Sequence, residues 1–141
     1  MIIVAVDLGQ ARTGLAVCDR GEVLASPLAV IQERDRARLV ERIAAAARER
    51  GAERLVVGLP RNMDGSEGES AQKARETGAM LAEASGLPVD FCDERGTTIT
   101  AHNYLNATNT RGKKRKAVVD AVAATVILED YLQSRRNSHP K

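Results

Sequence analysis

The sequence predicts an α/β domain built on a mixed β-sheet. Residues 2–6 form a continuously apolar run rich in β-branched residues, which is typical of a central strand buried on both faces. Two more strand patterns follow this run, and helix and strand patterns alternate after them. The 141 residues suit one compact core, so we expect a single domain over residues 1–141.

The first half of the chain contains three predicted strands and one helix. The later two strands are expected at residues 15–18 and 23–31, and the short turn at 9–14 favours a hairpin between the first two strands. A helix is expected over residues 35–50, because its apolar residues fall on one face and Gly51 suits its end. The apolar residues of that face are Leu39, Val40, Ile43, Ala44 and Ala47.

The second half alternates strands with helices. Short apolar strands are expected at residues 55–59 and 89–92. Between them, Ser66 and Glu69 have the spacing of a capping box, which predicts a helix that ends near Ser85.

The end of the chain is predicted to be mainly helical. A short helix is expected at about residues 97–105, and a loop at residues 106–114, which are rich in Asn, Thr and Gly. The last helix is expected over about residues 115–133, followed by a polar, flexible tail at residues 134–141.

Composition excludes several classes of protein. No apolar run approaches the roughly 20 residues of a membrane span, and residues 1–7 lack the basic segment of a secretion signal. We therefore expect a cytoplasmic protein without membrane association. Cys18 and Cys92 lack metal-ligand spacing and lie in apolar stretches, so they are predicted to be free thiols.

Positive charge is concentrated in one segment, although the net charge is only +2. Residues 111–116 hold five cations in six residues, which indicates either a solvated loop or a clamp for a phosphate backbone. The chain has only one Phe and two Tyr, so stacking on nucleic-acid bases is not expected.

Two acids interrupt apolar patterns. Asp7 ends the run at residues 2–6, where a carboxylate is costly unless it is paired or bound to a cation, and the alternative is a turn or cap residue that faces solvent. Asp120 shares a helix face with Ala123, Ala124 and Ile127, and the alternative there is a rim residue stabilised by the helix dipole.

A third acid is expected after the strand at residues 89–92. Asp93 and Glu94 are adjacent, so only one of them can point to a given site, and the residues alone do not choose between them or exclude a surface pair with Arg95. Three clustered carboxylates repel one another without a cation, and their oxygens suit Mg²⁺ or Mn²⁺. Two such ions about 4 Å apart can support phosphodiester hydrolysis.

Four sequence blocks, spread over almost the whole chain, carry a resemblance to a known family. The blocks are residues 4–9 with 12–17 and 19, residues 56–60 with 62–66, residues 93–95 with 97, 98 and 101, and residues 116–121 with 123, 124, 127 and 128. In this order and spacing the sequence resembles the YqgF family, also called RuvX, of the ribonuclease H-like superfamily.

The resemblance implies a ribonuclease H-like fold, with a five-stranded mixed sheet flanked by helices. It implies that Asp7, Glu94 and Asp120 are catalytic acids that bind Mg²⁺ or Mn²⁺, and that residues 58–60 and 62–65 border the substrate groove. Further residues expected to bind nucleic acid are Arg12, Asn62, Arg95, Thr98, Arg111, Lys113, Lys114 and Lys116. Gly96 and residues 102–104 depart from the family pattern. Gly96 stands where the family usually has an apolar residue and is expected to loosen the strand-to-helix turn, but neither departure removes an acid.

The resemblance also implies the substrate. Processing of the 5′ end of precursor 16S ribosomal RNA is the expected function, and cleavage of four-way DNA junctions, which needs a C2 homodimer, is the alternative. A non-catalytic nucleic-acid-binding module is a third reading. The segment Asp7-Leu8-Gly9 also resembles the phosphate loop of actin-like ATPases, but those proteins need a second such domain, for which this chain has no room.

Overall fold

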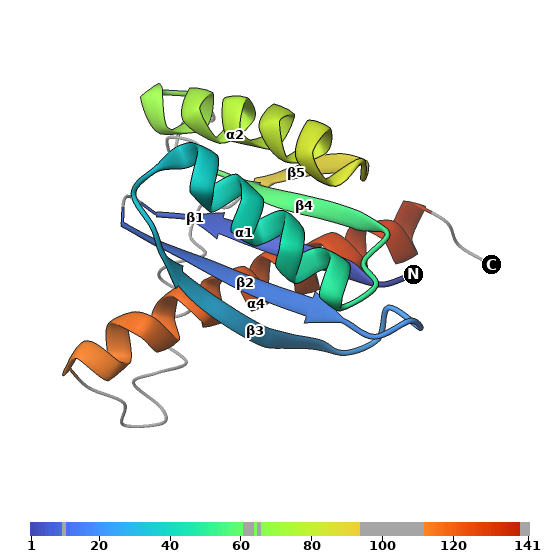
Figure 1. The fold of residues 1–141 in the computed structure, drawn as a ribbon. Coiled ribbons are helices and arrows are strands. Elements are labelled where there is room, and N and C mark those ends of the chain that lie inside the picture. Colours follow the sequence, from blue (N-terminus) through green and yellow to red (C-terminus); the bar gives the residue numbers. More distant parts are fainter. Residues whose placement is uncertain (10, 61–63, 65, 94–111, 139–141) are drawn as a thin grey trace.

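The computed structural model describes residues 1–9, 11–60, 64, 66–93 and 112–138, with the backbone alone for 112–120 and 138. The described part contains a five-stranded sheet in the order β3-β2-β1-β4-β5 and three helices (Figure 1). The elements in chain order are β1 (Ile3–Leu8), β2 (Arg12–Cys18), β3 (Ala25–Gln32), α1 (Arg36–Glu49), β4 (Arg54–Leu59), α2 (Glu69–Ser85), β5 (Val89–Asp93) and α4 (Gly112–Ser138).

The sheet is mixed, as predicted. β1, β2 and β3 are antiparallel neighbours, whereas β1, β4 and β5 run parallel. α1 and α2 cover one face of the sheet and α4 covers the other (Figure 1). The parallel strands end at the same end of the sheet as that at which all three helices begin (Figure 1). No helix among the described residues is long and apolar enough to cross a membrane.

Alternation along β1 divides the core into two layers. Val4 and Val6 pack with α1 and α2, and Ile3 and Ala5 pack with α4. All four side chains are fully buried, which explains why the sequence shows a continuous apolar run rather than an alternating one.

α4 lies on the sheet through a stripe of residues that the sequence predicts. Ala123, Ala124 and Ile127 are buried, and Ala124 and Ile127 pack in one cluster with Ala5 and Ala16 of the sheet. Small residues on both sides let the helix backbone approach the strands closely.

The β1–β2 hairpin turns tightly at Gly9. A Cβ atom on this residue would lie 2.3 Å from the carbonyl oxygen of Arg12, so no other residue fits without a shift of the backbone. The edge strand β3 carries Pro27, and its register with β2 shifts between Leu15 and Ala16.

The predicted end of α1 is confirmed, but the predicted start of α2 is wrong. Asp35 caps α1 by accepting a hydrogen bond from the Arg38 N–H, and Gly51 after the helix has φ +68°. Ser66 does not cap α2, because its N–H and hydroxyl both donate to Asp64, and the N-cap residue is Gly68.

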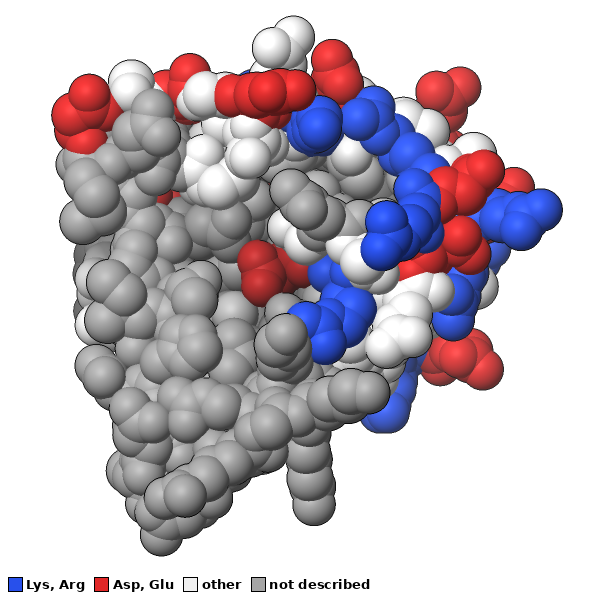
Figure 2. Space-filling model, turned by 90° about the vertical axis from the view of Figure 1, so that its left-hand side faces the viewer, with Lys and Arg blue, Asp and Glu red and all other residues white. Residues whose placement is uncertain are grey.

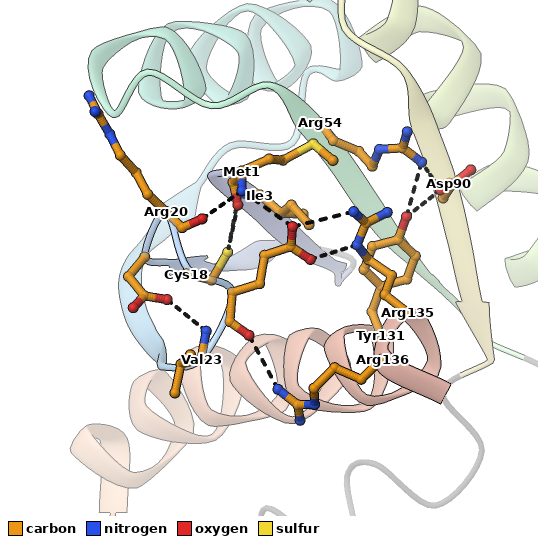
Figure 3. Close-up of polar contacts among 12 residues, drawn as sticks. Met1, Ile3, Cys18, Arg20, Val23, Arg54, Asp90, Tyr131, Arg135 and Arg136 are labelled. Atoms are coloured by element: carbon orange, nitrogen blue, oxygen red, sulfur yellow. Dashed lines mark hydrogen bonds and ion pairs between the residues drawn. The ribbon is translucent and has the colours of Figure 1, made fainter. Parts of the chain in front are cut away.

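α4 is longer at both ends than the pattern predicts. It begins at Gly112, so residues 112–114 are helical rather than part of a loop, and it continues through Ser138 instead of ending in a tail at residue 134. Its last turns are held because Arg135 and Arg136 both bind Glu22, in the turn between β2 and β3 (Figure 3). The predicted helix at 97–105 lies outside the described residues.

Glu22 is held by several groups at once. Its carboxylate accepts hydrogen bonds from Arg135 Nε at 2.7 Å and from the Met1 amino group at 3.2 Å (Figure 3). Its backbone has φ +57°, which is uncommon for a residue with a side chain. Cys18, nearby, is buried and Cys92 is half-buried, and both are free thiols as predicted.

Replacing Glu22 by Gln should make the stability of the protein less dependent on pH. The hydrogen bond from Arg135 holds the pKa of Glu22 below its ordinary value of 4.5, so the carboxylate contributes its full stability above that pH. This contribution is lost as the pH falls through the lowered pKa. Urea unfolding at pH 7 should show Glu22→Gln less stable by roughly 1 kcal/mol. The difference should shrink at pH 3, whereas Glu49→Gln, at an exposed position, should show none. An equal difference for Glu22→Gln at both pH values would contradict a lowered pKa for Glu22.

Candidate active site

Asp7 lies near the carboxyl end of β1, on the face of the sheet that α4 covers. Because side chains alternate along a strand, Asp7 shares this face with Ile3 and Ala5, both of which pack in the α4 layer. Asp7 is half-buried. The first predicted acid therefore faces the helix that carries Asp120.

Glycines occupy the neighbouring positions on both strands beside Asp7. Gly14 on β2 is its cross-strand partner. On β4, Gly58 follows Val57, which pairs with Val6, so Gly58 lies one step further along, beside Asp7. Because glycine has no side chain, neither strand places a side chain next to the carboxylate on this face, and a ligand can approach the backbone closely.

The structure separates Asp93 from this face. Asp90 and Cys92 contact α4, through Tyr131 and the carbonyl oxygen of Ile127 respectively. The alternating residues of β5 pack with the α1 and α2 layer, and Phe91 lies against Gly78 of α2. Asp93 shares the parity of Phe91, so alternation places it on the face opposite Asp7.

Arg12, the first residue of β2, shares the face of Asp7. Its parity matches Gly14 and Ala16, and Ala16 packs in the α4 layer. Arg12 is thus a diagonal neighbour of Asp7, at a separation that a long side chain can span. The structure brings together these two residues of the predicted site.

Asp120 lies in α4, three, four and seven residues before the buried Ala123, Ala124 and Ile127. Its backbone precedes the α4 residues that pack on the sheet, and α4 begins beyond the end of the sheet at which the parallel strands end (Figure 1). Lys113, Lys114 and Lys116 also belong to α4, and the structure describes the backbone of all four positions.

The remaining predicted residues lie outside the described part of the chain. They are Asn62, Glu94, Arg95, Thr98 and Arg111. Asp7 is the one predicted acid whose side chain is described, and the described residues contain no group of three His, Cys, Asp or Glu able to hold a metal ion.

A polar cluster that the sequence does not reveal ties α4 to the parallel strands (Figure 3). Tyr131 of α4 donates its hydroxyl hydrogen to Asp90 of β5, and Arg54 of β4 donates to Asp90 at 2.6 Å and to Tyr131 at 3.2 Å. The bond from Tyr131 lowers the pKa of Asp90, while burial raises the pKa of Tyr131. Each residue alone looks like an ordinary strand or helix residue, so no sequence pattern identifies the cluster.

Related proteins from several bacteria match almost the whole chain. A protein of Chloroflexus aurantiacus is 38% identical over 137 residues, covering 97% of this chain and 90% of its own length. A protein of an Anaeromyxobacter species is 44% identical over 135 residues, covering 96% and 98%. Both carry the name "Putative pre-16S rRNA nuclease".

Solved structures confirm the expected ribonuclease H-like fold. Thermus thermophilus RuvC in complex with a Holliday junction substrate superimposes with a TM-score of 0.62 at 15% identity, covering 98% of this chain and 97% of RuvC. A fowlpox virus resolvase in complex with Holliday junction DNA gives 0.60 at 11% identity, covering 96% and 99%. At these identities the likeness shows the fold alone.

A family model described as "RuvX: Holliday junction resolvase" matches residues 1–134. This match and the identities of the named relatives agree with the four sequence blocks. The chain therefore belongs to the RuvX family.

Proposed function

We propose that the chain is a metal-dependent nuclease that acts in the cytoplasm on the 5′ end of precursor 16S ribosomal RNA. The observation that carries this proposal is the position of Asp7, which ends a buried central strand, faces α4 and is flanked by Gly14 and Gly58. Membership of the RuvX family supports nuclease chemistry, and the names of the relatives support the ribosomal substrate.

The metal ligands would be Asp7, Glu94 and Asp120. Carboxylate oxygens suit Mg²⁺ or Mn²⁺, and the two glycines beside Asp7 leave backbone that an ion and a phosphate can approach. Two bound ions would supply an activated water and stabilise the leaving oxygen. The protein's part is to hold the acids on one face of the sheet and to bind the substrate strand.

Glu94 is supported over Asp93 by the parity of β5. Asp93 falls on the face opposite Asp7, because it shares the parity of Phe91 rather than that of Asp90 and Cys92. We therefore assign the third acid to Glu94, with no role for Asp93 at the metal.

Substrate binding would use cations next to the acids. Arg12 lies on the face of Asp7, and the lysines of the first turns of α4 precede Asp120 on the same helix. Asn62, Arg95, Thr98 and Arg111 complete the proposed phosphate contacts.

Cleavage of four-way DNA junctions is the second candidate. It is favoured by the description of the matching family model, and it requires a C2 homodimer because two strands must be cut. The chemistry at Asp7 would be the same for both substrates.

Asp7→Asn and Glu94→Gln should each lower metal-dependent cleavage by about 100-fold or more, because each removes a ligand of an ion that supplies several kcal/mol of transition-state stabilisation. Substrate binding should persist in both. Asp93→Asn, at a position on the face opposite Asp7, is the matched control and should keep near-normal activity. Full cleavage by Asp7→Asn, or by the wild-type protein in excess EDTA, would reject the nuclease proposal.

Replacing Lys113, Lys114 and Lys116 by Ala should weaken substrate binding and flatten its dependence on salt. Each lost phosphate contact lowers the slope of log K against log salt by about 0.7 to 0.9. Fluorescence anisotropy titrations at several salt concentrations measure this slope. An unchanged slope would show that these lysines do not contact phosphates.

One experiment separates the two substrates. The same preparation is given a precursor 16S leader RNA and a mobile four-way DNA junction, each with Mg²⁺ or Mn²⁺, and the products are mapped. Site-specific cleavage of the RNA supports the ribosomal function. Symmetric cleavage of the junction alone would favour the resolvase instead.

A further inference from the structure

A second site lies at the same end of the sheet as Asp7 but on the opposite face. A cleft of about 440 Å³ opens between α1, α2 and the end of β1. Its apolar lining includes Leu8, Leu39 and Ala74. Leu39 and Ala74 are almost fully buried, so the apolar part of the cleft belongs to the packed core rather than to a loose surface loop.

Three cations also line this cleft: Arg34, Arg36 and Lys73. The single acid among the lining residues is Glu33, which accepts a hydrogen bond from the Asp35 N–H at 3.3 Å and lies 3.9 Å from Arg42. Figure 2 views this end of the molecule, where Lys and Arg side chains lie among Asp and Glu side chains. The lining residues themselves combine an apolar surface with an excess of positive charge.

The cations are poorly neutralised by the protein itself. Among the described residues, Arg34 forms no ion pair or hydrogen bond through its side chain. Arg36 pairs with Glu76 at 3.1 Å and Lys73 with Glu69 at 3.8 Å, but these pairs are exposed. Exposed pairs contribute about 0 to 1 kcal/mol, so a phosphate can replace the carboxylates at little cost.

The start of α2 adds hydrogen-bond donors. Its N-cap residue, Gly68, offers no side chain to the first N–H groups of this 17-residue helix, and Ser70 of the first turn lines the cleft. Helix N-termini with uncapped N–H groups favour anions. The cations and the helix start thus favour the same kind of ligand.

The cleft is directly connected to the candidate active site through the chain. Leu8 and Gly9, which line it, immediately follow Asp7 in the sequence. Because adjacent side chains on a strand point to opposite faces, Asp7 and Leu8 lie on opposite faces of the sheet at the end of β1. A nucleic-acid strand that crosses the end of β1 would pass from one to the other.

We propose that this cleft binds the substrate strand on one side of the cleaved bond. Arg34, Arg36 and Lys73 contact its phosphates, and the apolar lining receives a sugar or base. The proposal rests on the nuclease function proposed above and extends its binding surface to the second face of the sheet.

The test compares two triple variants of equal charge in an Asp7→Asn background, which prevents cleavage. One carries Arg34→Ala, Arg36→Ala and Lys73→Ala. The control carries Arg20→Ala, Arg48→Ala and Arg50→Ala, three exposed arginines outside the cleft. Binding of the nucleic acid that the wild-type protein cleaves, either leader RNA or four-way junction, is measured by fluorescence anisotropy across salt concentrations, with thermal melts to confirm folding.

The cleft variant should bind at least 10-fold more weakly than the Asp7→Asn parent, with a salt slope about 2 units smaller for three contacts to a single strand. The control variant should stay within about 2-fold of that parent. Equal losses in both variants would show a general charge effect and overturn the proposal, as would unchanged binding in the cleft variant.

Trimmed substrates locate the contact. Removing the nucleotides on one side of the cleaved bond should abolish the difference between the cleft variant and its parent, whereas trimming the other side should preserve it. A difference that survives both trims would overturn the proposal. If the wild-type protein cleaves its substrate but the cleft variant binds normally, only this inference fails, and if the wild-type protein does not cleave, the nuclease function itself fails.

Discussion

The packing of α4 on the sheet is the interaction on which the rest of the structure depends. The helix lies on small residues, Ala5 and Ala16, through its own Ala124. Side chains this small leave little freedom in the separation of helix and sheet, because a larger residue on either side would force them apart. Small residues continue along the strands toward the end of β1, where Gly14 and Gly58 flank Asp7. The polar cluster of Arg54, Asp90 and Tyr131 fixes the same helix further along.

The order and type of the elements could be predicted because each depends on local pattern. All five residues expected on the buried face of α1 are buried, and the alternation of helix and strand after three early strands gives the mixed sheet. The prediction that Asp7 and Asp120 belong to one site also rests on local pattern, since each acid interrupts an apolar face.

Features that join distant segments could not be predicted in this way. The last turns of α4 are held by the contact of Arg135 with Glu22, 113 residues earlier. The local sequence is polar and contains no sign of this contact, so it predicts a flexible tail. Ser66 has a suitable position for a cap but binds Asp64 instead, which no spacing rule distinguishes. The face of Asp93 follows only from knowing that Asp90 contacts α4, and the cleft combines residues from β1, α1 and α2.

The two edges of the sheet differ in their capacity to pair with another chain. β3 carries Pro27, which has no N–H to donate, and its register with β2 is irregular, so this edge resists the addition of a sixth strand. β5 has a regular register with β4, and its outer edge has no partner strand among the described residues. If two copies associated by extending the sheet, they would meet at β5, the strand that contacts α4 through Asp90 and Cys92.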